Sequence, residues 1–480
     1  MKRFISTLLV VVLVFTSMLT LSSCALLGGG GNKGNNLADF EVPEEGFDTQ
    51  TPVTIKFYHT MGKDLRDVLD DAIARFTALY PNITIEHEQV GSYDDVRDRV
   101  KTEISVNGQP NIAYCYPDHV ALYNLAKATI KLDNLIASEI TVTRADGTTE
   151  TLGLTADQIA DFIPGYYAEG AQFDEEGTMY TLPLSKSTEL LYYNKTFFEA
   201  NNLKVPTTWA EMEKTCQDIL AIDSTCVPLG YDSESNWFIT MCEQYGSDYT
   251  SATGEHFLFD NDTNFNFVKM FREWYQKGYV TTQELNGGKY SSTLFTATTG
   301  QKCYMSIGSS AGAKNQKPAN NAFEVGCTIV PQVNPAEPKV ISQGPSLCIF
   351  GKENSQEVIA SWLFVKFLTT DVEFQARFST VSGYVPVIQS VNENKTYADT
   401  LAKANGYEYL TALAAKKCLD QANAYYTSPA FNGSSTARDQ VGILLQACLT
   451  QTPQGGESEM DMIKRLFKEA IDECEYQHPN

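Results

Sequence analysis

Strand patterns and helix patterns alternate along the chain after residue 51. The stretch PVTIKFYH (52–59) alternates apolar and polar residues, which predicts a strand. In the following DLRDVLDDAIARFTALYP, apolar residues recur every three or four positions, which predicts a helix that ends at Pro81. NITIEHEQV, a helix from Tyr93 to Val106, and NIAYCY repeat the pattern. Strands and helices of these lengths in alternation predict right-handed βαβ units, and therefore an α/β fold.

The later part of the chain keeps this pattern with one interruption. VTRADGTTETL has an Asp146-Gly147 pair between strand-forming residues, which predicts a surface hairpin. Further strands are predicted around YMSIG, FEVGCTIVP and PSLCIFG, a long helix begins at Ser355, and a last helix covers 458–475. We find no internal repeat in the sequence, and 480 residues are enough for two or three domains.

Five sequence motifs follow one another in an order that is typical of one protein family. They are KFYHTMG followed by ARFTALYPNITIE, PLSKSTELLYYNKTFF with PTTWAEM, YMSIGSSAG, EVGCTIVP and SGYVPV. In this order they resemble the extracellular solute-binding proteins of ABC sugar importers (bacterial family 1), which include the glycerol-3-phosphate and maltodextrin binding proteins. The resemblance extends from about Val53 to the C-terminus.

The resemblance implies a two-lobed, type II periplasmic-binding-protein-like fold of the α/β class, with a ligand cleft between lobes that are joined by crossing strands. We expect lobe one to comprise 52–186 and 328–388, and lobe two to comprise 187–327 and 389–476. Ligands of α/β proteins bind where strands end and helices begin, which is the cleft in this fold. The resemblance also implies a monomer without cofactor that delivers its ligand to the transmembrane permease subunits of an ABC importer.

The ligand contacts of the glycerol-3-phosphate binder fall on residues of suitable chemistry in this chain. Serine hydroxyls and the backbone at a glycine turn pair with ligand hydroxyls, while tyrosine and tryptophan rings cover the C–H face of a sugar. The resemblance implies contacts at Tyr93, Ser187, Trp237, Ser309 or Ser310, Gly344 and Tyr384. We add His59, which follows the first strand, and Asp118, whose carboxylate can accept two hydroxyls. Ordinary packing is the alternative for each aromatic residue and for a lone histidine.

Two departures from the glycerol-3-phosphate binder bear on the ligand. Pro117 stands where that binder has a ligand-contacting glutamate, and Ser434 stands where it has the arginine that meets phosphate. A phosphate needs a guanidinium or a helix N-terminus, and Arg438 or Lys186 would have to replace the arginine. We therefore expect an uncharged sugar or oligosaccharide as the ligand, with glycerol-3-phosphate or another polyol phosphate as the alternative.

The N-terminal residues have the pattern of an export signal followed by a lipid attachment site. Two basic residues precede an uncharged, largely apolar run from 8 to 21, which is short for a membrane span. The sequence LSSC that follows resembles the bacterial lipobox. We therefore expect a signal peptide at 1–23, lipidation of Cys24, a flexible tether over 24–51, and a location at the extracellular face of the cell membrane. A secretory signal with Cys24 as an ordinary thiol is the alternative.

Charge and cysteine content limit the remaining function classes. The net charge changes from −23 to −25 when Lys2 and Arg3 leave with the signal, and so acidic a protein is a poor partner for nucleic acid. Ten cysteines besides Cys24 permit disulfides, with Cys216 and Cys226 nearest in sequence, but buried free thiols fit equally well. No Cys-x-x-Cys occurs and the five histidines lie far apart, so no metal site is predicted.

Two enzyme classes share single features with this sequence. GSSAG (308–312) matches the Gly-x-Ser-x-Gly nucleophile motif of hydrolases, but the only histidine after it, His478, is three residues from the chain end. A secreted glycoside hydrolase needs two carboxylates, and no spacing marks such a pair among the 59 acidic residues, so it is only a distant alternative. We assign no catalytic residue and expect a binding protein, not an enzyme.

Overall fold

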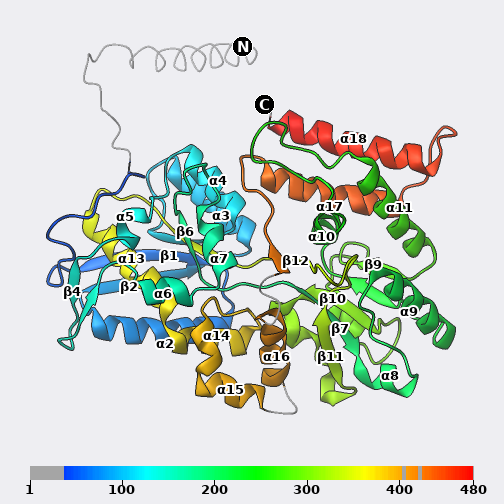
Figure 1. The fold of residues 1–480 in the computed structure, drawn as a ribbon, viewed down its shortest axis with the longest axis horizontal. Helices are drawn as coiled ribbons and strands as arrows, with labels where there is room; N and C mark the ends of the chain where they lie inside the picture. The colour runs from blue at the N-terminus through cyan, green and yellow to red at the C-terminus, as the bar shows by residue number, and fades with distance from the viewer. Residues whose placement is uncertain (1–36, 403–406, 420–423, 479–480) are drawn as a thin grey trace, which may run out of the picture. The chain divides into compact units, whose positions relative to one another are not determined.

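The computed structural model describes residues 37–402, 407–419 and 424–478. The predicted signal peptide (1–23) and the predicted lipidation site, Cys24, lie outside the described residues. Within the described part, two five-stranded sheets carry the helices (Figure 1). The part built on the first sheet is lobe one, and the part built on the second sheet is lobe two.

The sheet of lobe one joins the first three strands of the chain to two strands from later segments. Its strands are β1 (Val53–His59), β2 (Ile83–Gln89), β3 (Ile112–Cys115), β6 (Thr181–Pro183) and β13 (Ser346–Ile349). Their order is β2-β1-β3-β13-β6, in which β1 is parallel to β2 and β3, and β13 is antiparallel to both of its neighbours. The predicted βαβ start of the chain is therefore confirmed.

Helices pack on both faces of this sheet, and the alternation of side chains along β1 explains why. Ile55 and Phe57 point into the larger core under α2 and α13, whereas Tyr58 points into a smaller core under α3 and α4. The helices of lobe one are α2 (Lys63–Leu79), α3 (Tyr93–Ile104), α4 (Pro117–Leu125), α5 (Asp133–Ile136), α6 (Ala156–Asp161), α7 (Pro164–Ala168), η1 (Glu169–Ala171), α13 (Ser355–Thr370) and α14 (Val372–Ser382). The predicted hairpin is present as β4 (Thr141–Thr143) and β5 (Thr149–Thr151), which pair antiparallel.

The sheet of lobe two has the order β11-β7-β10-β8-β9. Its strands are β7 (Glu189–Asn194), β8 (Leu229–Tyr231), β9 (Val280–Thr282), β10 (Met305–Ser309) and β11 (Val325–Ile329). Its helices are α8 (Lys195–Ala200), α9 (Trp209–Ile222), α10 (Glu234–Tyr245), α11 (Asp262–Gln276), α12 (Ser292–Phe295), η2 (Ser310–Gln316), η3 (Ala319–Asn321), α17 (Ser434–Thr450) and α18 (Glu459–Gln477). Figure 1 shows α17 and α18, in orange and red, beside α10 and α11, which they contact.

The chain first crosses from lobe one to lobe two between β6 and β7, at Ser187 as expected. The return was expected at 328, but this position lies in β11, which pairs along its whole length with β7 of lobe two. The chain returns only between β12 (Val340–Ile341) and β13. The expected boundary at 328 is thus too early, because an apolar run predicts a strand without indicating which sheet it joins.

The third connection also differs from the expected boundary at 388. Val385 exchanges backbone hydrogen bonds with Lys186 of the first crossing, and the chain continues through η4 (Gln389–Glu393), α15 (Lys395–Leu401) and α16 (Tyr407–Leu419). Helix α16 packs on α14 of lobe one and on β11 and η2 of lobe two. The chain then enters β14 (Tyr425–Tyr426), which pairs with β12. The segment after 388 therefore contacts both lobes before it joins lobe two.

Residues 37–51, expected to be part of a flexible tether, pack on lobe one. Ala38 and Phe47 are buried, and the Phe47 ring lies edge-on to Tyr80 at 6.2 Å between centroids. The backbone N–H of Lys131 donates to the Ala38 carbonyl at 2.9 Å. Gly351 allows this approach, because a Cβ on it would lie 2.4 Å from the Leu37 Cβ. From Leu37 onward the tether prediction is therefore wrong, because apolar side chains dock the backbone there.

No disulfide joins the ten buried cysteines of the described chain, so the predicted alternative of bridges, including Cys216 with Cys226, is not adopted. Burial raises the pKa of these two thiols, and a protonated thiol is a poor nucleophile.

Among the described helices, we find none that combines the length and the apolar character of a membrane span.

Candidate ligand-binding cleft

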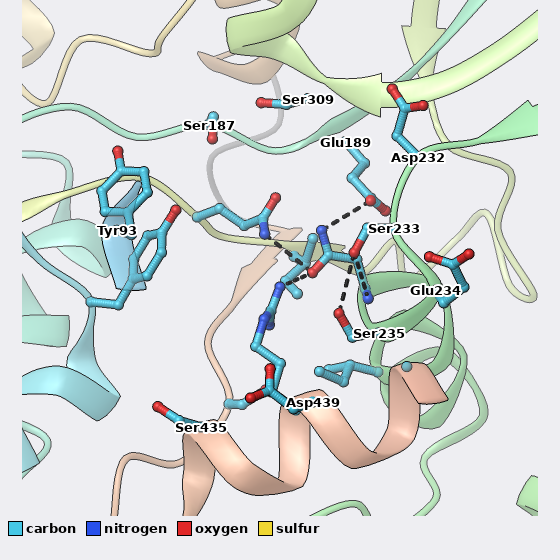
Figure 2. A pocket seen from close by; sticks show the side chains of 18 of the residues that line it. Tyr93, Ser187, Glu189, Asp232, Ser233, Glu234, Ser235, Ser309, Ser435 and Asp439 are labelled. Atoms are coloured by element: carbon cyan, nitrogen blue, oxygen red, sulfur yellow. Dashed lines mark hydrogen bonds between the residues drawn. The ribbon is translucent and has the colours of Figure 1, made fainter. Parts of the chain in front are cut away.

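A cavity of about 1050 Å³ lies between the two lobes. It is formed where strands β3, β8 and β10 end and where α3, α4, α10 and α17 begin, so helix N-termini and loops face it from both sides. Figure 2 shows Tyr93 on one wall and the carboxylates of Glu189, Asp232 and Glu234 on the opposite wall. The volume is slightly above the usual range of small-molecule sites, about 300 to 1000 Å³.

The wall from lobe one is aromatic. Tyr93 is the first residue of α3, and Ser92 caps this helix by accepting a hydrogen bond from the Asp95 N–H at 3.2 Å. The Tyr93 ring stacks on Tyr116 with 4.4 Å between centroids, and its hydroxyl lies 3.2 Å from that of Tyr384. Burial raises the pKa of Tyr93 well above its usual value, so this hydroxyl stays protonated. The stack offers ring faces and neutral hydroxyls to a ligand.

The wall from lobe two is a hydrogen-bond network centred on Asn236. The Asn236 Nδ2 donates to Glu189 Oε1 at 3.0 Å, and its Oδ1 accepts from Gln343 Nε2 at 3.1 Å and from the guanidinium of Arg438. Tyr231 donates its hydroxyl to the other oxygen of Glu189 at 2.5 Å. Asn236 therefore links the carboxylate of Glu189 to the guanidinium of Arg438, and its bond with Gln343 connects both to the second crossing.

Buried carboxylates on this wall have raised pKa values. Burial raises the pKa of Glu189 to about 7, although hydrogen bonds from Tyr231 and Asn236 and the charge of Arg438 act in the opposite direction. Burial likewise raises the pKa of Asp232 to about 6, against a hydrogen bond from the Ser291 N–H. Buried carboxylates with raised pKa values in a cleft are candidates for a functional site.

A family model described as bacterial extracellular solute-binding protein matches residues 71–405. The chain belongs to this family. The sn-glycerol-3-phosphate-binding periplasmic protein UgpB of Rhizobium meliloti is 23% identical over 371 residues, which are 75% of this chain and 81% of the relative. The multiple sugar-binding protein of Streptococcus mutans is 22% identical over 356 residues, 72% of this chain and 77% of the relative.

Solved structures of solute-binding proteins share the fold. UgpB of Mycobacterium tuberculosis in complex with glycerophosphocholine aligns with a TM-score of 0.69 and 17% identity, over 88% of this chain and 99% of that chain. The GacH receptor of Streptomyces glaucescens aligns with a TM-score of 0.66 and 17% identity, over the same shares. The fold is thus the two-lobed type II fold, and the protein is an extracellular solute-binding protein of the ABC importer class, not an enzyme.

Five of the residues that the sequence predicted for the site of this solute-binding protein line the cavity: Tyr93, Asp118, Ser187, Ser309 and Tyr384. Asp118 also accepts a hydrogen bond from Ser435 of lobe two, so it bridges the two lobes at the start of α17. Four others lie outside the cavity lining: His59, Trp237, Ser310 and Gly344.

Trp237 was predicted to cover a ligand face, but it lies in the core of lobe two. It is fully buried and stacks on Tyr231 at 4.8 Å and against Phe271 at 3.8 Å between ring centroids. Successive residues of a helix point about 100° apart, so the cavity-lining Asn236 and its neighbour Trp237 face different surroundings. The aromatic residues at the cavity come from lobe one and from Tyr249 and Tyr290 instead.

Ser310 and Gly344 have structural positions. Ser310 is fully buried, and its hydroxyl has no hydrogen-bond partner in the described chain. Two positions earlier, Gly308 leaves room for Asp232, whose Oδ2 would lie 2.5 Å from a Cβ there. Gly344 has φ of 100°, and a Cβ on it would lie 2.6 Å from the Ser185 carbonyl oxygen. It therefore allows the second crossing to run directly against the first.

His59 lies behind the cavity in a chain of hydrogen bonds. Its Nδ1 accepts from the Met61 N–H at 3.1 Å, so its proton is on Nε2, which lies 2.9 Å from His87 Nδ1. His87 Nε2 in turn lies 2.9 Å from Asp70. His59 is fully buried, and burial, with the nearby charges of His87 and Arg66, lowers its pKa from 6.5 to about 3.

The lowered pKa of His59 predicts a loss of stability in mild acid. Below pH 6.5 the unfolded chain binds a proton at this imidazole and the folded protein does not, so the free energy of unfolding falls as the pH decreases from 6.5 towards 3. The slope from this group approaches about 1.4 kcal/mol per pH unit. Urea denaturation at pH 7, 6 and 5 should show a shallower pH dependence for His59→Gln than for the wild type. Equal slopes would contradict this assignment.

Several cavity residues carried no clear sequence signal. Glu189, Asp232 and Asn236 were not predicted, and Arg438 was considered only as a replacement for a phosphate-binding arginine. Glu189 had one detectable signal, since it is a lone charge before the apolar run LLYY of a strand. The rest of the network depends on contacts between segments far apart in the chain, such as Asn236 with Arg438.

Proposed function

We propose that the protein is a lipid-anchored receptor at the extracellular face of the cell membrane, which captures a sugar or oligosaccharide and delivers it to an ABC permease. The ligand carries no phosphate, as in the uncharged sugars expected from the sequence. The main support is one cavity that combines stacked tyrosine rings with a wall of hydroxyls, amides and carboxylates. These groups match the C–H face and the hydroxyl edge of a sugar ring.

The alternative ligand is glycerol-3-phosphate or another polyol phosphate. The names of UgpB from Rhizobium meliloti and the glycerophosphocholine complex of the Mycobacterium tuberculosis protein favour it. Arg438, which forms no ion pair with any described residue, is the group that could meet a phosphate. Against it, Asp118 already brings a carboxylate to the start of α17, where a phosphate would bind. Lys186, the other candidate, is buried in an ion pair with Glu169.

A thermal-shift screen separates these ligands. We expect one or more neutral mono- or oligosaccharides to raise the unfolding temperature, because a ligand at 100 times its dissociation constant adds about 2.7 kcal/mol to the free energy of unfolding. Glycerol-3-phosphate should have no effect at the same concentration. Stabilisation by glycerol-3-phosphate that is lost in Arg438→Ala would instead establish the alternative. No stabilisation by any sugar or phosphate would refute the proposed ligand class.

The proposed anchor rests on the lipobox-like sequence that ends at Cys24. In Cys24→Ser, the protein should leave the membrane fraction and appear in the medium or as an unprocessed precursor, because the thiol that receives the lipid is absent. Immunoblots of cell fractions measure this, and Ser23→Ala is the matched control that keeps the thiol. Membrane retention and processing of Cys24→Ser like those of the wild type would refute the anchor.

A further inference from the structure

Three carboxylates meet on the lobe-two wall of the cavity. Glu189 is the first residue of β7, Asp232 follows the last residue of β8, and Glu234 is the first residue of α10. The two strands bring these ends to the same edge of the sheet, because β10 between them is antiparallel to β7 and parallel to β8. None of the three forms an ion pair with another residue of the described chain. Burial is the main cause of the raised pKa values of Glu189 and Asp232, and the neighbouring charges of Asp232 and Glu234, respectively, raise them further.

An unpartnered acceptor lies beside these carboxylates. Gln316, at the end of η2, lines the cavity and is 2% exposed, and its Oε1 has no hydrogen-bond partner among the described residues. Gln316 and Asp232 both approach Gly308, where a Cβ would lie 3.6 Å from Gln316 Nε2 and 2.5 Å from Asp232 Oδ2. A buried acceptor without a donor costs free energy, so this position favours a ligand that donates hydrogen bonds.

The negative charge of this wall favours a positively charged hydrogen-bond donor over a neutral one. At pH 7 Asp232 is mostly ionised, since its pKa is about 6, and Glu189 is about half ionised, since its pKa is about 7. The guanidinium of Arg438, which could offset this charge, is engaged by Asn236. A sugar hydroxyl brings one donor and no charge, whereas a protonated amine brings three donors and one positive charge. When a ligand displaces water from the cavity, carboxylates without a counter-charge lose solvation that a neutral hydroxyl does not replace.

We propose that Glu189, Asp232 and Gln316 form a subsite for a protonated amine of the ligand, so that an amino sugar binds more tightly than the same sugar with a hydroxyl at that position. This inference rests on the proposed function, since it specifies the sugar that the cavity selects. The aromatic wall of lobe one contacts the ring of that sugar, and the carboxylates of lobe two contact its amine.

Matched pairs of sugars test the subsite by isothermal titration calorimetry at pH 7. The probes are glucose with glucosamine, galactose with galactosamine, mannose with mannosamine, and cellobiose with the β-1,4-linked disaccharide of glucosamine. In at least one pair, the amino sugar should bind about tenfold more tightly, because charge-assisted hydrogen bonds are about twice as strong as neutral ones. The N-acetylated sugars control for shape, since acetylation removes the charge and should remove the advantage.

Two variants assign the effect to the wall. Glu189→Gln and Asp232→Asn should each lower the ratio of amino-sugar to hydroxyl-sugar affinity, whereas Glu176→Gln, an exposed carboxylate outside the cavity lining, should leave the ratio unchanged. If hydroxyl sugars bind and no amino sugar binds more tightly than its partner, the subsite is refuted and the proposed function stands. If neither kind of sugar binds, both are refuted.

Discussion

Lys186→Ala is expected to lower the free energy of unfolding by about 3 to 5 kcal/mol, because it leaves the carboxylate of Glu169 buried without a counter-charge. The two side chains are 1% and 2% exposed and form an ion pair, and the Lys186 ammonium also contacts the Ser346 hydroxyl at 3.1 Å and the Gly344 carbonyl at 3.4 Å. Urea denaturation followed by circular dichroism measures the change. Lys186 lies in the first crossing, so the loss of stability should also affect the segments that connect the two lobes.

Two comparisons make this prediction specific. Lys186→Met combined with Glu169→Leu should recover most of the lost stability, because two apolar side chains of similar size leave no uncompensated charge. Lys195→Ala is the matched control, since Lys195 and Glu324 form an exposed ion pair at 2.9 Å and should contribute little. A loss in Lys186→Ala no larger than in Lys195→Ala would contradict the role of the buried pair.

Trp237→Ala is expected to cost about 3 to 5 kcal/mol of folding free energy, as for other large-to-small changes in a core. Trp237 is fully buried between Tyr231 and Phe271. Tyr116→Ala should have the opposite effects, because the Tyr116 ring lines the cavity. We expect a small change in the free energy of unfolding and a loss of about 1 to 3 kcal/mol in the free energy of sugar binding. Thermal denaturation and calorimetric titration of the same samples separate the two effects.

The conservative variant Trp237→Phe keeps the test informative if Trp237→Ala does not fold. It should fold and bind sugar with wild-type affinity, since phenylalanine preserves most of the packing and the side chain does not reach the cavity. Wild-type stability with weakened binding in Trp237→Phe would return this residue to the ligand site that the sequence predicted for it.

The parts of the fold that the sequence predicted depend on residues close together in the chain. The alternation in β1 and the apolar spacing in α2 each reflect burial on one face of a local element, so pattern alone identified them. The resemblance located Tyr93, at the start of a helix, and Ser309, which lies in the motif YMSIGSSAG at the end of a strand. These element ends face the cleft, so the predicted residues there line the cavity.

The remaining features arise from orientation and from distant contacts. Trp237 and Asn236 are adjacent, and only the rotation of α10 decides which one lines the cavity. The bonds of Asn236 to Glu189 and Arg438 span 47 and 202 residues of sequence, and no local pattern encodes them. The segment 37–51 was assigned to a tether because a run of glycine and asparagine precedes it, although Phe47 is apolar and packs against Tyr80.

The docking of residues 37–51 on lobe one has a mechanical consequence. An anchor at Cys24 would be linked to the folded body by residues 25–36, which reach about 40 Å even when fully extended. Any pull on the anchor would enter lobe one at Leu37, against Gly351, and would reach lobe two through the crossing segments and through contacts between the lobes, such as that of Asp118 with Ser435. Lobe one would then be the lobe held near the membrane, and lobe two the lobe whose position the anchor restricts less.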